Sequence, residues 1–217
     1  MCCVSRAIGK RPRVLVITPS KELALQVEDV CKTLGRLFHV TSTCITGRSG
    51  KRQTRRVRRL RDGADILICT PGSALDLIER KDLFLSHVSH VVLDEADTLL
   101  GFGSGFQPVI HEIFKPLLRR RAAMRPPVTQ FVFVAASIND QVRGLIQNEF
   151  PNVSSISSSY LHHLLPRMKE SFIYVGGNDK LSLLTAILQA GPGKVQLHSV
   201  FSVWNWFQMC VVCRLRK

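Results

Sequence analysis

The stretch VVLDEADTLL, Val91–Leu100, joins an apolar, β-branched run directly to three acidic residues. A continuous apolar run is typical of a strand that is buried on both faces of a parallel sheet. An acid at the end of such a strand loses hydration free energy, and a cation must compensate for that loss. The acids also stand out in a chain whose formal net charge is +14. The stretch therefore predicts a buried strand that ends in a turn with a chemical role.

Other apolar runs of the chain share this character. The five candidate strands are Val14–Thr18, Val40–Thr46, Asp65–Cys69, His90–Asp94 and Gln130–Val134. Between the first two, apolar residues recur at helical intervals, with Ser20 as a candidate N-cap and Gly35 as a candidate helix end. The linking segments 51–62, 72–80 and 106–121 also fit helices. This alternation predicts an open α/β sheet of parallel strands with helices on both faces.

The composition favours an intracellular protein with a polyanionic partner. Lys and Arg number 30 against 16 Asp and Glu, and eight of the cations lie between Arg48 and Arg61. Nucleic acid fits such a patch better than an anionic membrane does. The seven cysteines are scattered and odd in number, which suits a reducing compartment. We expect no membrane span, because the chain has no uninterrupted apolar run of about 18 residues.

In an open parallel sheet the functional residues follow the carboxyl ends of the strands. The turns after the candidate strands read PSKELA from Pro19, GR from Gly47, TPGS from Thr70, DEAD from Asp94 and AAS from Ala135. Asp94 is a candidate ligand of a nucleotide-bound Mg²⁺. Glu95 could orient or deprotonate a water that attacks a phosphoanhydride. The alternative is that the acids only complement the dipole of a helix N-terminus.

The order and spacing of these five turns closely resemble the DEAD-box RNA helicases. In that family the signals PTRELA, GG, TPGR, DEAD and SAT lie in the first of two RecA-like domains, and the resemblance covers roughly residues 13–190. It implies a RecA-like fold, ATP and Mg²⁺ as cofactors, and RNA-stimulated ATP hydrolysis coupled to RNA unwinding or remodelling.

The resemblance also implies a role for each matching position. Asp94 would hold Mg²⁺ through the nucleotide, Glu95 would position water, and Asp97 would hydrogen-bond to Ser137 and link ATP to domain closure. The alternative for Ser137 is an ordinary N-cap of a helix over Ile138–Phe150, and the two roles are compatible. Backbone N–H groups and cations of the first three turns would grip the phosphates of RNA without reading its bases. The residues that inherit this grip are Pro19, Ser20, Lys21, Gly47, Arg48, Thr70, Pro71 and Gly72.

The sequence departs from the family at several places. Arg48 replaces a Gly, Ser73 replaces an Arg and Ala135 replaces a Ser, and each change weakens an RNA or coupling contact. No stretch reads Gly-x-x-x-x-Gly-Lys-Ser/Thr, the loop that cradles phosphates and that the family places before PTRELA. We therefore expect an incomplete RecA-like sheet without the P-loop strand and helix, from an incomplete or mispredicted gene product. A single-domain paralogue is the alternative.

Changes of composition predict the domain organisation. We expect a partial first helicase domain at 1–150, a linker at 151–167, the start of a second domain at 168–194 and a divergent tail at 195–217. The leading hypothesis is a DEAD-box helicase fragment that is inactive alone. The alternatives are a non-catalytic basic module that binds RNA or ribonucleoprotein, and a product that does not fold by itself. Mitochondrial and nucleolar locations and ribosome-assembly partners are compatible with the resemblance.

Overall fold

The computed structural model describes residues 8–47, 51–123, 128–136, 138–156, 181–182 and 185–186, without the side chains of residues 51, 52 and 121. The chain divides into two compact units, residues 1–155 and 156–217. All of the features below belong to the first unit.

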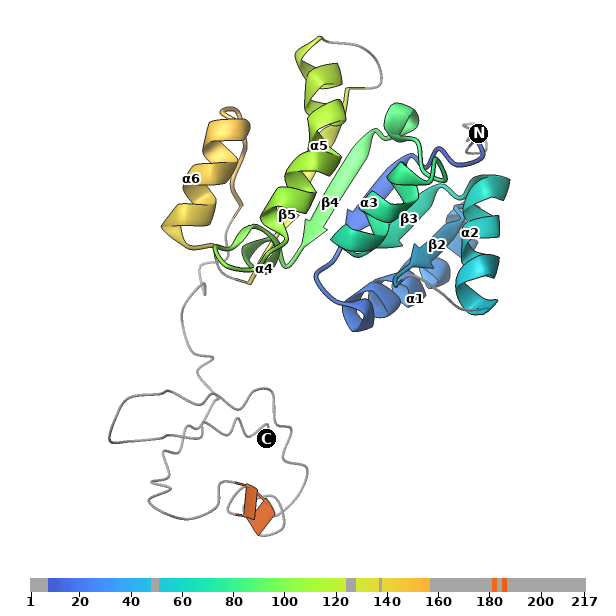
Figure 1. The fold of residues 1–217 in the computed structure, drawn as a ribbon, viewed down its shortest axis with the longest axis horizontal. Helices are drawn as coiled ribbons and strands as arrows, with labels where there is room; N and C mark the ends of the chain where they lie inside the picture. Colours follow the sequence, from blue (N-terminus) through green and yellow to red (C-terminus); the bar gives the residue numbers. More distant parts are fainter. Residues whose placement is uncertain are drawn as a thin grey trace. The chain divides into compact units, whose positions relative to one another are not determined.

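The first unit is built on a five-stranded, all-parallel sheet (Figure 1). The strands are β1 (Val14–Ile17), β2 (Ser42–Ile45), β3 (Ile66–Cys69), β4 (His90–Asp94) and β5 (Gln130–Val134). Their order across the sheet is β2-β3-β1-β4-β5, so β2 and β5 are the edges. In register, Val16 of β1 lies between Ile68 and Val92. The predicted fold class is confirmed, and β4 and β5 have their predicted bounds.

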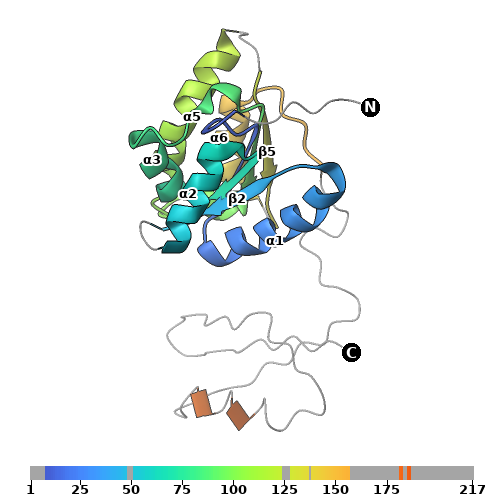
Figure 2. The same ribbon diagram turned by 90° about the vertical axis from the view of Figure 1, so that its right-hand side faces the viewer.

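Helices cover the two faces of the sheet. The helices are α1 (Lys21–Phe38), α2 (Lys51–Gly63), α3 (Pro71–Glu79), α4 (Ala96–Leu100), α5 (Gln107–Ala122) and α6 (Asp140–Glu149), with a 3-10 turn at Leu85–His87. Figure 2 shows α1 on one side of the sheet and α2, α3 and α5 on the other. Because strand side chains alternate, Val16 packs with Ala24 of α1, whereas Leu15 packs in the larger core on the opposite face.

The predicted N-cap of α1 is confirmed, but its predicted end is wrong. Ser20 Oγ accepts a hydrogen bond from the Leu23 N–H at 3.2 Å. The helix continues past Gly35 to Phe38, and His39 closes it in the left-handed conformation with φ 54°. Gly35 is buried, and a Cβ there would overlap the carbonyl oxygen of Val40. The glycine therefore serves the return of the chain toward β2.

The predicted N-cap of α6 is also wrong. Asn139, rather than Ser137, caps the helix, and its side-chain oxygen accepts from the Val142 N–H at 2.8 Å. The helix accordingly begins at Asp140, two residues later than predicted. Asn and Ser are both good N-caps, and Asn139 takes this role because its side-chain oxygen meets the N–H of the third helical residue, Val142. Ser137 itself lies outside the described residues.

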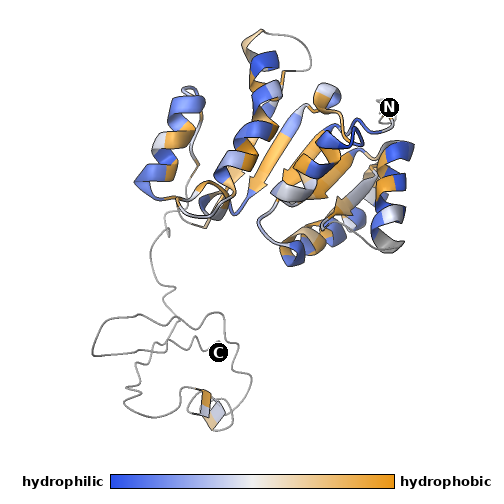
Figure 3. Cartoon of the chain, in the orientation of Figure 1, coloured by the Kyte–Doolittle hydropathy of each residue, from blue (hydrophilic) through white to orange (hydrophobic). Residues whose placement is uncertain are grey.

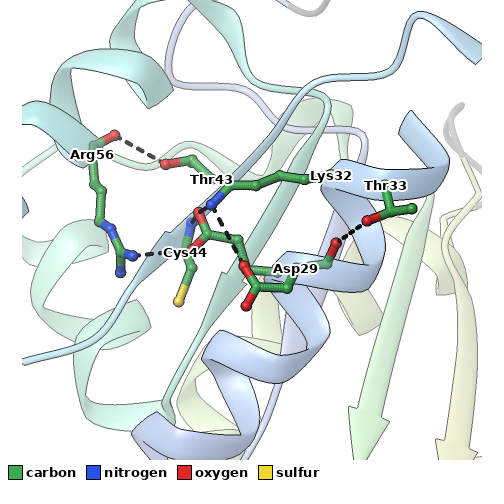
Figure 4. Close-up of polar contacts among 7 residues, drawn as sticks. Asp29, Lys32, Thr33, Thr43, Cys44 and Arg56 are labelled. Carbon is green, nitrogen blue, oxygen red and sulfur yellow. Dashed lines mark hydrogen bonds and ion pairs between the residues drawn. The ribbon is translucent and has the colours of Figure 1, made fainter. Parts of the chain in front are cut away.

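A buried carboxylate joins α1, β2 and α2. The Glu28 side chain is 1% exposed, and it pairs with Arg56 Nη2 at 3.0 Å and with Lys32 Nζ at 3.1 Å. It also accepts from the Cys44 N–H at 3.2 Å. Figure 4 shows Arg56, Lys32 and Cys44 converging on this point from three different elements. The cluster fixes α2 against the edge strand β2.

Apolar side chains remain exposed at the opposite edge. Val132 and Val134 of β5 are 37% and 47% exposed. Leu37 and Phe38, at the end of α1 that leads into β2, are also exposed. Figure 3 shows that the strands are mainly apolar and that α2 consists mainly of hydrophilic residues. In the described part of the chain no helix has the length and hydropathy needed to cross a membrane.

Candidate functional site at the carboxyl edge of the sheet

All five predicted turns follow strands of the same parallel sheet. They therefore lie in a row along its carboxyl edge, where all five strands end. The strand order places the turn after β3 between those after β2 and β1, with the turns after β4 and β5 beyond β1. This row of five turns has two halves. One half contains the turns that begin at Gly47, Thr70 and Pro19, and the other contains the acidic turn at Asp94 and the turn at Ala135.

The acidic turn combines a half-buried and an exposed carboxylate. Asp94 ends β4 and is half-buried, and its Oδ1 accepts from the Glu95 N–H at 3.1 Å. Glu95 is exposed and adopts the left-handed conformation, with φ 53° and ψ 52°. For a residue other than glycine this conformation costs about 1–2 kcal/mol. It ends the strand abruptly, so that α4 begins at Ala96.

The acidic turn fits a magnesium ion that a nucleotide shares with the protein. Within the described ranges, Asp94, Glu95 and Asp97 form no ion pair, and Asp94 Oδ2 has no hydrogen-bond donor. No group of three or more metal-ligating side chains occurs there either. Mg²⁺ is commonly held by one or two carboxylates together with phosphate oxygens and water, which requires no cage of protein ligands. The carboxylates of the acidic turn therefore suffice for Mg²⁺ that is shared with a nucleotide, but not for a metal ion held by protein ligands only.

The predicted link between Asp97 and Ser137 stays a prediction. Asp97 is half-buried in the first turn of α4, and its carboxylate makes no hydrogen bond to any described residue. Ser137 lies outside the described residues, although Ala135 and Ala136 lie directly after β5, the strand beside β4.

Ser73, which stands where the family has an arginine, joins two turns of the other half. The Gly47 N–H donates to Ser73 Oγ at 2.9 Å, and Ser73 Oγ lies 3.0 Å from Thr70 Oγ1. Ser73 is 7% exposed. Gln53 adds a second link, because its Nε2 donates to the Gly47 carbonyl at 2.8 Å. The signal in the sequence that could have suggested this link is that a serine is small enough to be buried and still accepts a hydrogen bond through its hydroxyl.

Two helix N-termini in this half present backbone N–H groups. Thr70 is the N-cap of α3, but its side chain makes no capping hydrogen bond. Pro71 at the first helical position has no N–H, and the Ala74 N–H donates to the Thr70 carbonyl at 3.0 Å. The N–H groups of Gly72 and Ser73 are therefore the ones in the first turn of α3 that can meet an anion. The space above the Cα of Gly72 is open, and Gly72 is exposed. Pro19, Ser20 and Lys21 form the corresponding entry into α1, and Lys21 is exposed. Arg48 lies outside the described residues.

Comparison with protein families gives one description for most of the chain. The DEAD/DEAH box helicase family model matches residues 2–145, which include all the strands and turns described above.

Curated relatives are similar over more of the chain. It is 32% identical over 193 residues to "DEAD-box ATP-dependent RNA helicase 39" of Arabidopsis thaliana, covering 88% of this chain and 30% of that protein. It is 33% identical over 189 residues to "Probable ATP-dependent RNA helicase DDX28" of Homo sapiens, covering 82% of this chain and 34% of that protein. The chain thus spans about a third of the length of these relatives.

A solved structure has a similar fold. The structure described as S. cerevisiae Dbp5 bound to RNA and ADP BeF3 is similar with a TM-score of 0.58 and 26% identity. The similarity covers 74% of this chain and 37% of that chain.

Proposed function

Because this chain belongs to the DEAD/DEAH box helicase family, we propose that it supplies the RNA-binding half and the acidic half of the site of an ATP-dependent RNA helicase. Such an enzyme would couple hydrolysis of the β–γ phosphoanhydride of ATP to unwinding or remodelling of RNA. The observation that supports the proposal most is the strand order. It places the turns after β2, β3 and β1 side by side and the acidic turn after β4 next to them.

The first half would bind the backbone of single-stranded RNA. We define the RNA strip as Pro19, Ser20, Lys21, Gly47, Arg48, Thr70, Pro71 and Gly72. The uncapped N-terminus of α3 at the exposed Gly72, the open space over Gly72 and the Lys21 ammonium group support this role. Contacts of this kind read phosphates, so the binding would tolerate any base sequence.

The second half would act on the nucleotide. Asp94 would hold Mg²⁺ with its unpaired oxygen, and the ion, when bound, would neutralise charge on the phosphates. The exposed carboxylate of Glu95 would hold the proton-accepting position beside the attacking water. Asp97 and Ser137 would connect this half to the neighbouring strand β5.

The 217 residues by themselves should bind RNA but should not hydrolyse ATP. They contain no Gly-x-x-x-x-Gly-Lys-Ser/Thr stretch to hold the β- and γ-phosphates. We expect RNA binding without RNA-stimulated ATP hydrolysis, so that ATP turnover should equal that of an Asp94→Ala, Glu95→Gln control. Free thiols at Cys31, Cys44 and Cys69 support an intracellular setting, where mitochondrial or nucleolar ribonucleoprotein would be a substrate.

The second candidate function is a basic module that binds RNA or ribonucleoprotein without catalysis. The unpaired arginines of α2 favour it, and they would act with or without ATP. The two candidates differ in the residues that matter. The helicase reading requires the RNA strip, whereas the basic module requires only α2.

Binding of a short fluorescent oligouridylate, about six nucleotides long, tests the role of the strip. Lys21→Gln combined with Gly72→Leu removes one cation and fills the open space over the strip. The matched control is Lys81→Gln with Gly144→Leu, because Gly144 on α6 is equally open and Lys81 is equally exposed. We expect at least a tenfold loss of affinity from the strip variant and little from the control. Equal affinities would refute the proposal.

A further inference from the structure

Helix α2 concentrates positive charge beyond what its packing requires. Its thirteen residues, KRQTRRVRRLRDG, hold seven cations and one acid, Asp62. Like charges one helical turn apart repel each other, so a surplus of this size destabilises a helix unless a polyanion relieves it.

Two of the arginines are neutralised where α2 meets the rest of the fold. Arg56 pairs with the buried Glu28 at 3.0 Å on the α1 side. Arg61 binds Asp82 through Nε at 3.1 Å and through Nη2 at 2.9 and 3.0 Å. These two side chains therefore anchor the helix, and their charges are paired with carboxylates of the protein.

Three arginines remain on the outer face. Arg55, Arg58 and Arg59 are exposed, and none of them forms an ion pair or hydrogen bond with any residue in the described ranges. Their i, i+3, i+4 spacing places them on one side of the helix. We call these three residues the arginine face. Asp62 is exposed one turn further on and forms no ion pair with them.

The arginine face lies next to the RNA strip. Thr43 Oγ1 of the edge strand β2 donates to the Arg56 carbonyl at 3.3 Å, so α2 runs along the outer edge of the sheet. Gln53 in the first turns of α2 is hydrogen-bonded to Gly47, a member of the strip. An RNA strand that passes Gly47 toward the edge of the sheet would therefore meet α2 next.

The geometry favours an RNA backbone over a membrane surface. A helix that lies on a membrane inserts apolar residues from the face that carries its contacts. The apolar residues of α2 instead pack into the core, where Leu60 is fully buried and Val57 is partly buried. The exposed face is polar and carries the guanidinium groups of the arginine face, whose forks of N–H donors match phosphate oxygens.

We propose that the arginine face of α2 is a second phosphate-binding site, which holds the RNA segment that leaves the strip at Gly47. This inference rests on the proposed function for the path of the strand. The site would lengthen the RNA footprint and raise its affinity in the absence of ATP. It would act on the backbone alone, so the gain would depend on RNA length and salt concentration and not on base sequence.

The test compares two triple variants of the full 217-residue chain. Arg55→Gln, Arg58→Gln and Arg59→Gln remove the arginine face, and Gln keeps nearly the same helix propensity. The control, Arg36→Gln, Arg119→Gln and Arg143→Gln, removes three equally exposed arginines from α1, α5 and α6. Circular dichroism checks that both variants fold. Affinities for oligouridylates of about 6 and about 16 nucleotides are measured between 50 and 200 mM salt.

We expect the arginine-face variant to lose affinity for the long RNA only. Three lost phosphate contacts should make the negative slope of log K against log salt less steep by about 2. The affinity for the long RNA should fall by a factor approaching 100 at about 0.1 M salt. The control should change the slope by less than half as much. Equal losses from both triples, or none from the arginine face, would overturn the inference. So would a loss of poly-glutamate binding as large as the loss of RNA binding, because that would indicate an acidic protein partner.

The outcome is separable from that of the proposed function. If the strip variant leaves short-RNA binding intact while the arginine-face variant weakens binding of the long RNA, the strip proposal fails and the arginine face stands. If the strip variant alone weakens RNA binding, the proposed role of the RNA strip is supported and the proposed role of the arginine face is refuted.

Discussion

Replacing Glu28 by Ala should destabilise the fold more than any other removal of a single charge in α1. The Glu28 carboxylate is 1% exposed and holds Arg56 at 3.0 Å, Lys32 at 3.1 Å and the Cys44 N–H at 3.2 Å. The variant would leave the Cys44 amide and the Arg56 guanidinium without this acceptor. Removing one partner of a buried ion pair costs about 3–5 kcal/mol.

Solvent reduces that cost for two of the three partners. The Arg56 and Lys32 side chains are 23% and 39% exposed, so water can replace part of what they lose. We therefore expect the lower end of the range, about 3 kcal/mol. With a urea m-value of about 2 kcal/mol/M, the unfolding midpoint would fall by about 1.5 M.

Urea unfolding followed by circular dichroism measures this loss, with Asp29→Ala as the matched control on the next residue. Asp29 is 81% exposed and reaches Lys32 only at 4.0 Å, so its removal should cost less than about 0.5 kcal/mol. Equal midpoints for the two variants would refute the reasoning. A wild-type chain without a single cooperative transition would instead favour the hypothesis that the product does not fold alone.

Three further outcomes follow from the structure. Gly35→Ala should cost about 1–3 kcal/mol in urea unfolding, since its methyl group would meet the Val40 carbonyl, whereas Gly72→Ala should be neutral. Burial alone would raise the pKa of Asp82, but hydrogen bonds from Lys10 and Arg61 outweigh it and lower that pKa. The Asp82 contribution to stability should therefore be present above its unfolded pKa of about 3.9 and disappear as the pH falls through the folded value, so that Asp82→Asn destabilises the chain at neutral pH but hardly at about pH 2. Val132→Lys with Val134→Lys should reduce concentration-dependent light scattering, because it places charge on an exposed apolar edge strand, and unchanged scattering would count against that edge as the cause.

The sheet could be predicted from sequence because its strands are short apolar runs that need no partner to be recognised. His90–Asp94 and Gln130–Val134 were predicted to the residue for that reason. Their order in the sheet could not be read from the runs themselves, since parallel strands of similar composition are interchangeable until packing decides. The grouping of the turns into two halves therefore became visible only in the structure.

Local patterns in the sequence could not show contacts with residues far away in the chain. Gly35 reads as a helix end, but the return of the chain at Val40 requires it. Ser73 reads as the loss of an arginine, but its hydroxyl meets Gly47, which lies 26 residues earlier in the chain. The charges of α2 read as one run, yet Glu28 and Asp82 divide them into anchors and the arginine face. In each case the deciding partner lies far away in the sequence.

The measurement that tests the central claim most directly is amide hydrogen exchange of the 217-residue chain with and without an oligouridylate of about 16 nucleotides. If the carboxyl edge binds RNA through its first three turns, exchange should slow in peptides that cover Pro19–Ala24, Gly47–Gln53 and Thr70–Asp76. Peptides that cover α5 and the acidic turn should keep their exchange rates. Protection confined to α5 or to the acidic turn, or no protection at the three turns at saturating RNA, would contradict the account.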